Sequence, residues 1–461
     1  MPEYEVEVAN VGPRGVPGTP GYIASRPALD AETAAVLADP ESEASEQLSA
    51  TIADGVAFGI DPLRTHDGVF IPSSLAALRW RQTRTRVLAG DQQGHIAVLG
   101  DSIPYGAAAT GASNPKPENN YPGRMRAILA AEYGPTGGGF TLFDNNLFAN
   151  PAWDPRLAKT GNVVTHTFGP FTSSTWRADG ADLSTYIDVT DVCSEFWIYS
   201  VTGGGQFTVS IDGGATIALS NISSGVGGTI ARESGYAFSV PLGVAQNVFR
   251  IPAGAIGQHT LRIRPSSNGS NDVFAIAIEP RIPTPGTFRV GNMSISGKSL
   301  NTFIHADDRS GVGNPLYGLT WLDALRADLL LIALGINDWQ GQRSLATIKS
   351  DLSMVIDRQR SAGSTLGGLH PNGDAILVWN PKPNTATLGG GAYVDPTWDA
   401  VRAVFYEVAI EKDVVLIDMG ERWKDFATAN ALGLFADTIH PGDAGADDIA
   451  AGVVHALFDV V

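Results

Sequence analysis

Short, mostly apolar runs separated by helix-like stretches constrain the fold of this chain more than any other feature of its sequence. HIAVLG begins at His95, DLLLIALG at Asp328, AILVW at Ala375 and VVLIDM at Val414. Continuous apolar runs of this length are typical of parallel strands that are buried on both faces. Helical patterns such as WDAVRAVFYEVAIEK lie between them. The alternation predicts an α/β fold in which helices cover both faces of a parallel sheet.

The middle of the chain has a different period. Between about 146 and 285, segments such as TYIDV, FWIYSV, QFTVSI and HTLRIRP are separated by Gly, Asn and Asp turns. Short strands at this spacing predict a β-sandwich. Because the α/β pattern resumes afterwards, we expect the sandwich (146–285) to be inserted into an α/β domain formed by 91–145 and 286–461.

Residues 1–90 do not have the pattern of the α/β domain. Gly12 to Gly21 reads GPRGVPGTPG, with three Gly-X-Y triplets. This stretch is either a Pro/Gly linker or a short collagen-like piece that neighbouring structure holds together as a trimer. The acidic, Ala-rich stretch from Ala28 to Ala57 has helical composition but a thin apolar stripe, so a helix there needs a partner surface. We interpret 1–90 as an attachment and oligomerisation segment.

Composition excludes several classes of function. The chain of 461 residues carries a formal net charge of −17 and no run of Lys or Arg, which disfavours nucleic acid as a partner. Cys193 is the sole cysteine and the His residues are dispersed, so we expect no disulfide, metal or cofactor. We also expect no signal peptide and no membrane insertion, because neither end nor middle has an apolar stretch of the required length.

Polar residues that follow the apolar runs are the first candidates for chemistry, because ligands collect at the carboxyl ends of strands in open α/β sheets. Ser102 follows the first run within Gly-Asp-Ser, where a strand-turn-helix change exposes a hydroxyl. Gly297 lies in MSISGKS, where a backbone N–H can approach a developing oxyanion. Asn337 follows DLLLIALG and offers a side-chain amide. We interpret its neighbour Asp338 as structural.

The pair Asp437 and His440 lies just before the last predicted helix. A carboxylate three residues before an imidazole can turn back to accept its Nδ1 proton, which leaves Nε2 free to take a proton from a serine. His370 also precedes a proline, but it comes before a strand rather than after one. We therefore expect His370 in a surface loop at the opposite edge of the sheet.

These blocks, in this order, resemble the SGNH/GDSL hydrolases. VLGDSIPYG is similar to the nucleophile block of that family, MSISGKS to its glycine block, LGINDW to its asparagine block and DTIHPGDAG to its Asp-x-x-His block. The resemblance implies a three-layer, flavodoxin-like α/β/α fold and a serine esterase. It further implies a catalytic triad of Ser102, His440 and Asp437, with the N–H groups of Ser102 and Gly297 and the Asn337 amide as oxyanion hole.

The substrate is less constrained. We expect carbohydrate esters, because an inserted β-sandwich resembles sugar-binding modules and no apolar lid helix is evident. Tyr105, Trp339 and Trp379 lie near strand ends, where they could stack on sugar rings, although a Trp in a large protein more often belongs to the core. The resulting hypothesis is an esterase that removes O-acetyl groups from cell-envelope or other polysaccharides. A lipid or acyl esterase, and a receptor-binding protein that uses a hydrolase fold for recognition, are the alternatives.

The N-terminal segment suggests where such an enzyme works. A short collagen-like piece and an Ala/Ser/Glu-rich helix before a hydrolase resemble the attachment ends of tail and fibre proteins of actinobacterial phages. This resemblance implies a virion tail location, other tail proteins as partners and a homo-oligomer such as a trimer. An extracellular esterase unrelated to a phage is the alternative location.

Overall fold

The computed structural model describes most of the chain from Arg64 onward. The described residues are 64–66, 68–109, 117–142, 149, 151–166, 175–178, 184–201, 205–221, 228–229, 237–238, 246–265, 273–305, 322, 325, 327–361, 373–385 and 395–461. The collagen-like and acidic stretches and His370 lie outside them, so the predictions made there stay predictions.

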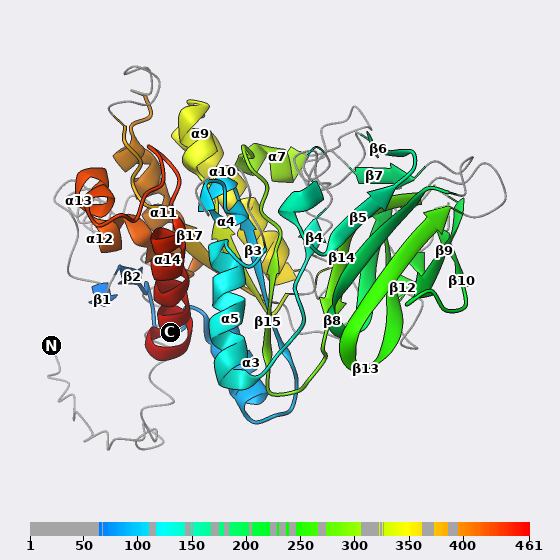
Figure 1. Ribbon diagram of the computed structural model, residues 1–461. Helices are drawn as coiled ribbons and strands as arrows, with labels where there is room; N and C mark the ends of the chain where they lie inside the picture. Colours follow the sequence, from blue (N-terminus) through cyan, green and yellow to red (C-terminus); the bar gives the residue numbers. More distant parts are fainter. Residues whose placement is uncertain are drawn as a thin grey trace, which may run out of the picture. The chain divides into compact units, whose positions relative to one another are not determined.

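A seven-stranded sheet, counted over the described residues, forms the core of the α/β part (Figure 1). Its order is β1 (Arg64–His66), β2 (Val69–Phe70), β18 (Val415–Asp418), β17 (Asp374–Trp379), β16 (Leu329–Ala333), β3 (Gly94–Gly100) and β15 (Phe288–Asn292). The strands from β18 to β15 run parallel, and β2 pairs with β18 antiparallel. Every residue of β3, β16, β17 and β18 is buried, which confirms the predicted parallel sheet.

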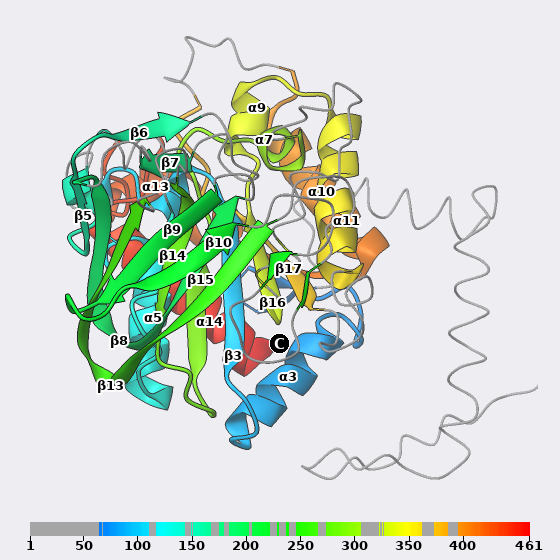
Figure 2. The same cartoon turned by 90° about the vertical axis from the view of Figure 1, so that its right-hand side faces the viewer.

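Helices cover both faces of this sheet. Figures 1 and 2 show α5 with α14 on one face and α10 with α11 on the other. The helices of the described residues are α3 (Leu78–Leu88), α4 (Ser102–Tyr105), α5 (Tyr121–Tyr133), α7 (Leu300–His305), α9 (Ile336–Gln340), α10 (Leu345–Ser361), α11 (Trp398–Lys412), α12 (Met419–Trp423), α13 (Phe426–Ala431) and α14 (Asp443–His455), with short turns η2 (Pro151–Trp153) and η4 (Ala456–Val460). None of these described helices is long and apolar enough to span a bilayer.

Side-chain caps define where the outer helices begin. The Asn120 side chain accepts a hydrogen bond from Gly123 N at 2.8 Å at the start of α5. Thr397 does the same for Ala400 N at 3.1 Å at the start of α11. Each cap satisfies a backbone N–H that the helix itself leaves without a partner.

The α/β part begins earlier than the sequence predicts. The described residues from Arg64 to Val461 fall in one compact unit, and β2 extends the sheet by pairing with β18. Trp80 of α3 is fully buried, and its indole Nε1 donates to the Leu457 carbonyl at 3.2 Å. The predicted boundary at residue 91 is therefore wrong. Residues 1–90 begin with a linker-like sequence, which predicts an attachment segment. Their last part, however, contains α3, which packs in the core through Trp80.

The inserted β region forms a second, nine-stranded antiparallel sheet in the described residues. Its strands are β4 (Thr141–Leu142), β5 (Leu157–Thr160), β6 (Val163–His166), β7 (Thr175–Ala178), β8 (Tyr186–Val201), β9 (Gly205–Ile211), β10 (Ile217–Asn221), β13 (Gln246–Pro265) and β14 (Val273–Arg281), and β11 (Gly228–Thr229) pairs with β12 (Ala237–Phe238). The register of β13 against β8 shifts between Pro252 and Gly257. Such a bulge bends a strand and increases its twist.

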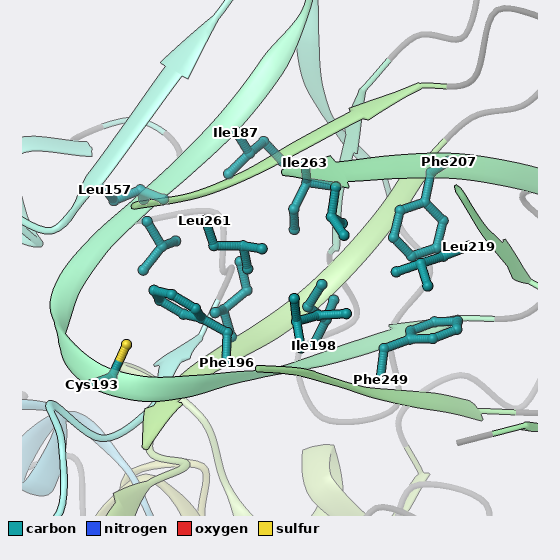
Figure 3. Packing of buried hydrophobic residues seen from close by; sticks show 14 of the residues in the cluster. Leu157, Ile187, Cys193, Phe196, Ile198, Phe207, Leu219, Phe249, Leu261 and Ile263 are labelled. Atoms are coloured by element: carbon teal, nitrogen blue, oxygen red, sulfur yellow. The ribbon is translucent and has the colours of Figure 1, made fainter. Parts of the chain in front are cut away.

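An apolar cluster lies between the two halves of the long strands. Figure 3 shows Ile187 and Ile263 on one side facing Phe196, Ile198 and Phe249 on the other. These side chains are 0 to 2 % exposed, so this region has a core of its own. The structure shows one bent sheet around this cluster, and the division into two packed sheets stays a prediction.

Buried ionic contacts join the two sheets. Arg289 of β15 pairs through Nη1 with Glu279 of β14, and its Nη2 contacts His95 Nδ1 of β3 at 2.6 Å. The Tyr199 hydroxyl of β8 donates to Glu279 at 3.1 Å. Because a guanidinium only donates, His95 Nδ1 must accept, which fixes the neutral tautomer of this ring. Buried charged groups thus attach the inserted region to the edge of the α/β part, and removing one of them would leave the other buried and unpaired.

Candidate active site

Ser102 lies on a tight turn at the carboxyl end of β3. It is the first residue of α4 and is 6 % exposed. The side chain of Asp101 caps this short helix by accepting Ile103 N at 3.0 Å. A Cβ atom at Gly100 would lie 2.1 Å from Pro104 Cγ, so the turn requires glycine there. The glycine of the Gly-Asp-Ser pattern is therefore a steric requirement of the turn that presents the hydroxyl.

His440 connects the serine to a carboxylate. Its Nε2 lies 3.0 Å from Ser102 Oγ, and its Nδ1 lies 2.8 Å from Asp437 Oδ2. An ionised carboxylate can only accept, so Nδ1 carries the proton and Nε2 is free to accept from the hydroxyl. The structure thus brings together residues that are 338 positions apart in the chain.

The Asp437 carboxylate also shapes its own loop. Its Oδ1 accepts the backbone N–H groups of Ile439 and His440, each at 2.6 Å. Burial opposes ionisation of this group, but these hydrogen bonds and the His440 ring outweigh it and lower the pKa of Asp437 below its usual value. The Asn384 N–H donates to the Thr438 carbonyl at 2.8 Å, which connects the loop to the segment that follows β17. The base is therefore held from both sides.

Gly297 and Asn337 follow the two strands that flank β3. The turn at Gly297 has φ 76°, and Ile295 N donates to the Gly100 carbonyl at 3.0 Å, which places this turn beside the nucleophile turn. Asn337 Nδ2 donates to the Lys298 carbonyl at 2.9 Å. A primary amide carries a second N–H, which remains for a ligand. Both predicted oxyanion donors thus lie at the edge of the sheet that holds Ser102.

A buried carboxylate lies directly beneath the nucleophile. Asp101 is 0 % exposed, and its Oδ2 accepts from the Asn380 side chain at 3.2 Å. Burial, with the negative charge of Asp338 as a smaller contribution, raises the pKa of Asp101 to about 7. Among the described residues, its hydrogen-bond donors are uncharged. This acid therefore resists ionisation up to neutral pH.

Sequence reasoning missed two asparagines that stabilise the site. Asn380 follows β17 and binds Asp101, as above. Asn292 ends β15, donates to the Pro104 carbonyl at 2.8 Å and accepts Ser294 N at 3.0 Å. Both occupy strand ends, so the rule that located Asn337 could have located them as well.

The predicted sugar-stacking role is wrong for both tryptophans. Trp339 and Trp379 are 1 % and 0 % exposed, and their ring centroids lie 5.2 and 4.5 Å from that of Trp398. Neither ring has a face open to a substrate. Tyr105 is half-buried at the end of α4, and its role in binding stays a prediction.

The arrangement supports one kind of chemistry. A hydroxyl, an imidazole and a carboxylate in hydrogen-bonded sequence, with N–H donors at the same edge, provide nucleophile, base and oxyanion stabilisation for acyl transfer. Within the described ranges, no group of three or more His, Cys, Asp or Glu side chains is arranged to hold a metal ion. The fold is SGNH hydrolase-like, and fold and site together define a serine ester hydrolase.

The family comparison locates this chemistry in the chain. The model of the GDSL-like Lipase/Acylhydrolase family matches residues 271–447, a stretch that contains Gly297, Asn337, Asp437 and His440. The nucleophile block lies outside the matched stretch, before the inserted β region. No curated protein matches the chain.

Solved structures share the fold at low sequence identity. A peptidoglycan O-acetylesterase is 15 % identical with a TM-score of 0.58, covering 85 % of this chain and 98 % of that one. A family two carbohydrate esterase from Cellvibrio japonicus is 12 % identical with a TM-score of 0.26, covering 66 % of this chain and 96 % of that one. An inhibitor-bound aryl esterase from M. smegmatis is 19 % identical with a TM-score of 0.29, covering 38 % and 80 %.

Proposed function

We propose that this protein removes O-acetyl groups from polysaccharides of cell envelopes through a Ser-His-Asp acyl-enzyme mechanism. The observation that carries the proposal is the hydrogen-bonded chain from Ser102 through His440 to Asp437. Gly297 and Asn337 at the same edge of the sheet supply the remaining elements of an acyl-transfer site.

In the first half of the reaction, Ser102 Oγ attacks the carbonyl carbon of the ester while His440 Nε2 takes the hydroxyl proton. Asp437 stabilises the imidazolium that forms, and its lowered pKa keeps it ionised at neutral pH. The oxyanion of the tetrahedral intermediate accepts from the N–H groups of Ser102 and Gly297 and from the second N–H of Asn337. His440 then gives its proton to the departing sugar oxygen, and the acyl group stays on Ser102.

In the second half, a water molecule gives a proton to His440 Nε2 and attacks the acyl carbon. The same donors hold the second oxyanion. Collapse of this intermediate returns the proton to Ser102 Oγ and releases the carboxylic acid, so the enzyme ends in its starting state.

The choice of an acetylated glycan has its own support. Of the three solved structures named above, the peptidoglycan O-acetylesterase has the highest TM-score. Its likeness covers 85 % of this chain. The α/β part alone is too short to account for that share. This coverage supports a shared arrangement that includes the inserted region. A glycan carrying acetyl esters is the substrate class that fits both the site and this likeness.

Acid release from O-acetylated peptidoglycan, acetylated xylan and a long-chain triacylglycerol tests the proposal, measured as acetate for the two glycans and as fatty acid for the lipid. Ser102→Ala serves as the blank. Ser210→Ala is the matched control, because Ser210 is similarly buried at 7 % but lies on β9. We expect acetate from the glycans with the wild type and Ser210→Ala only. Preference for the triacylglycerol would favour a lipid esterase, and equal rates for wild type and Ser102→Ala would leave a binding role as the function.

The location of the enzyme is a separate proposal. The virion tail, the tail-protein partners and the trimer rest on residues 12–57 alone, and an extracellular enzyme is the alternative. Light scattering of the full chain tests the assembly, since a monomer in solution would contradict the trimer.

A further inference from the structure

Asp338 is a buried acid that the proposed mechanism does not use. It is 0 % exposed and belongs to the first turn of α9, directly after Asn337. An acid in this position commonly caps its own helix, but no side chain caps the start of α9. The Asp338 carboxylate instead binds a different segment of the chain.

Its two oxygens have distinct partners. Oδ2 accepts the backbone N–H of Leu300 at 3.0 Å, and Oδ1 pairs with Arg343 Nη1 at 2.5 Å. Arg343 also pairs with Asp351 at 2.6 Å. Burial raises the pKa of Asp338, whereas the Leu300 N–H and Arg343 favour its ionised form. The ion pair therefore holds the carboxylate where it meets Leu300.

Leu300 begins α7, three residues after Gly297, and is itself 0 % exposed. The neighbouring Asn337 holds the same loop through the Lys298 carbonyl at 2.9 Å. Asn337 and Asp338, consecutive residues in the first turn of α9, therefore fix the loop at Lys298 and at Leu300. Side-chain packing does not fix Gly297 itself, because a Cβ atom built there would have no neighbour within 4 Å. Hydrogen bonds on both sides of it, from Ile295 N before it and from Leu300 N after it, therefore determine where its N–H points.

From this geometry we infer that Asp338 is a positioning residue of the oxyanion hole: it anchors Leu300 and thereby orients the Gly297 N–H. The inference rests on the proposed function, since it needs an oxyanion to stabilise. Catalytic groups must be held within about 0.5 Å of their productive position, and a misplacement of about 1 Å can cost roughly a hundredfold in rate. The sequence alone predicts a structural role for Asp338, and the inference adds the positioning of the oxyanion hole to that role.

The test compares Asp338→Ala and Asp338→Asn with Asp374→Ala. Asp374 is a matched control, because it is 2 % exposed, accepts Ala375 N at 3.0 Å and pairs with Arg360 at 3.3 Å, but lies at the start of β17. The measurements are kcat and KM for 4-nitrophenyl acetate, active sites counted by titration with an organophosphate, and Tm.

We expect Asp338→Ala to lower kcat per titrated site about 10- to 100-fold, with KM within about twofold. Asp338→Asn keeps an acceptor for Leu300 N and should recover most of the loss. Asp374→Ala should lower Tm without lowering kcat per site. If Asp338→Ala does not fold, Asp338→Leu fills the same volume without an acceptor and takes its place.

A double variant separates positioning from a general effect. With Asn337→Ala already present, Asp338→Ala should lower kcat by less than about a further threefold, because both residues act through the same oxyanion hole. Independent, multiplicative losses, or a kcat for Asp338→Ala equal to that of Asp374→Ala, would overturn the inference. Ser102→Ala tests the proposed function separately, since retained hydrolysis in that variant would contradict the esterase itself, whatever Asp338 does.

Discussion

The two edges of the parallel sheet both carry aspartates that accept backbone N–H groups. At the carboxyl edge, Asp101 and Asp338 bind the amides of the turns that carry Ser102 and Gly297. At the amino edge, Asp328 accepts His95 N at 2.8 Å, and Asp374 accepts Ala375 N at 3.0 Å.

The aspartates at the two edges make the same kind of hydrogen bond but hold different parts of the molecule. The Asp328 carboxylate holds β16 to β3 through His95 N, and the Asp374 carboxylate holds β17 to α10 through Arg360. Asp101 and Asp338 fasten turns, and those turns hold the reacting groups. We therefore expect a buried carboxylate to stabilise the fold at the amino edge and to support catalysis at the carboxyl edge.

The largest effect should follow from removing the nucleophile or the base. Ser102→Ala and His440→Ala should each lower kcat/KM about 10⁴- to 10⁶-fold, because either change interrupts the proton transfer on which acyl transfer depends. Thermal unfolding should remain close to that of the wild type. An ester-hydrolysis rate within about tenfold of the wild type would contradict the assigned roles.

Removing one oxyanion donor should have a smaller effect. Asn337→Ala should lower kcat about 10²- to 10³-fold with little change in KM, since it removes one donor to the oxyanion and the hydrogen bond that holds the Lys298 carbonyl. Steady-state kinetics on a soluble acetate ester measure this. The control is Asn430→Ala at an exposed position of α13, which should leave kcat unchanged.

At the amino edge, Asp374→Ala should lower stability by about 3 kcal/mol, because Arg360 and the backbone N–H would lose their buried partner. Urea unfolding measures this, and kcat per folded molecule should not change. A specific loss of kcat would show that the amino edge also positions the site, and the distinction between the edges would fail.

The smallest effect should come from the charge of Asp101 and should depend on pH. The folded protein keeps this carboxyl protonated up to about pH 7, whereas an unfolded aspartate releases its proton at about pH 4. Between these values the folded state binds the extra proton, so raising the pH weakens folding.

Asp101→Asn removes this titration and keeps an acceptor for Ile103 N. The Tm of the variant minus that of the wild type should therefore increase from about pH 4 to about pH 7 and stay constant above it. Scanning calorimetry across this range measures the difference. A difference that does not vary with pH would show that Asp101 is already ionised in the folded protein at low pH.

Strand ends were the most informative positions in the sequence. The apolar runs predicted β3, β16, β17 and β18, and the residues after them predicted Ser102 and Asn337 at one edge. The same rule failed for Trp339 and Trp379, because position along a strand specifies the edge but not the direction of a side chain. Both indoles turn inward and pack on Trp398 of α11.

The strand-end rule can locate Asn380, but the partners of Asp101, Asp338 and Asn380 could not be predicted from it. Each partner lies on another strand or loop, as with Asn380 and Asp101, which are 279 positions apart. A carboxylate near a strand end is typical of solvated turns and of buried anchors alike. Only its burial and its hydrogen-bond donors distinguish the two.

The sequence alone predicts the parallel sheet and its interruption by a β region, and it names Ser102, His440 and Asn337 as the candidate nucleophile, base and oxyanion donor. These follow from hydrophobic period and from residue type, which are local properties of the chain. The tertiary structure alone decided that β2 and α3 belong to the α/β part, that both tryptophans are core residues, and that Asp338 holds the turn at Gly297. These depend on which distant segments exclude water from one another, and local sequence does not record that.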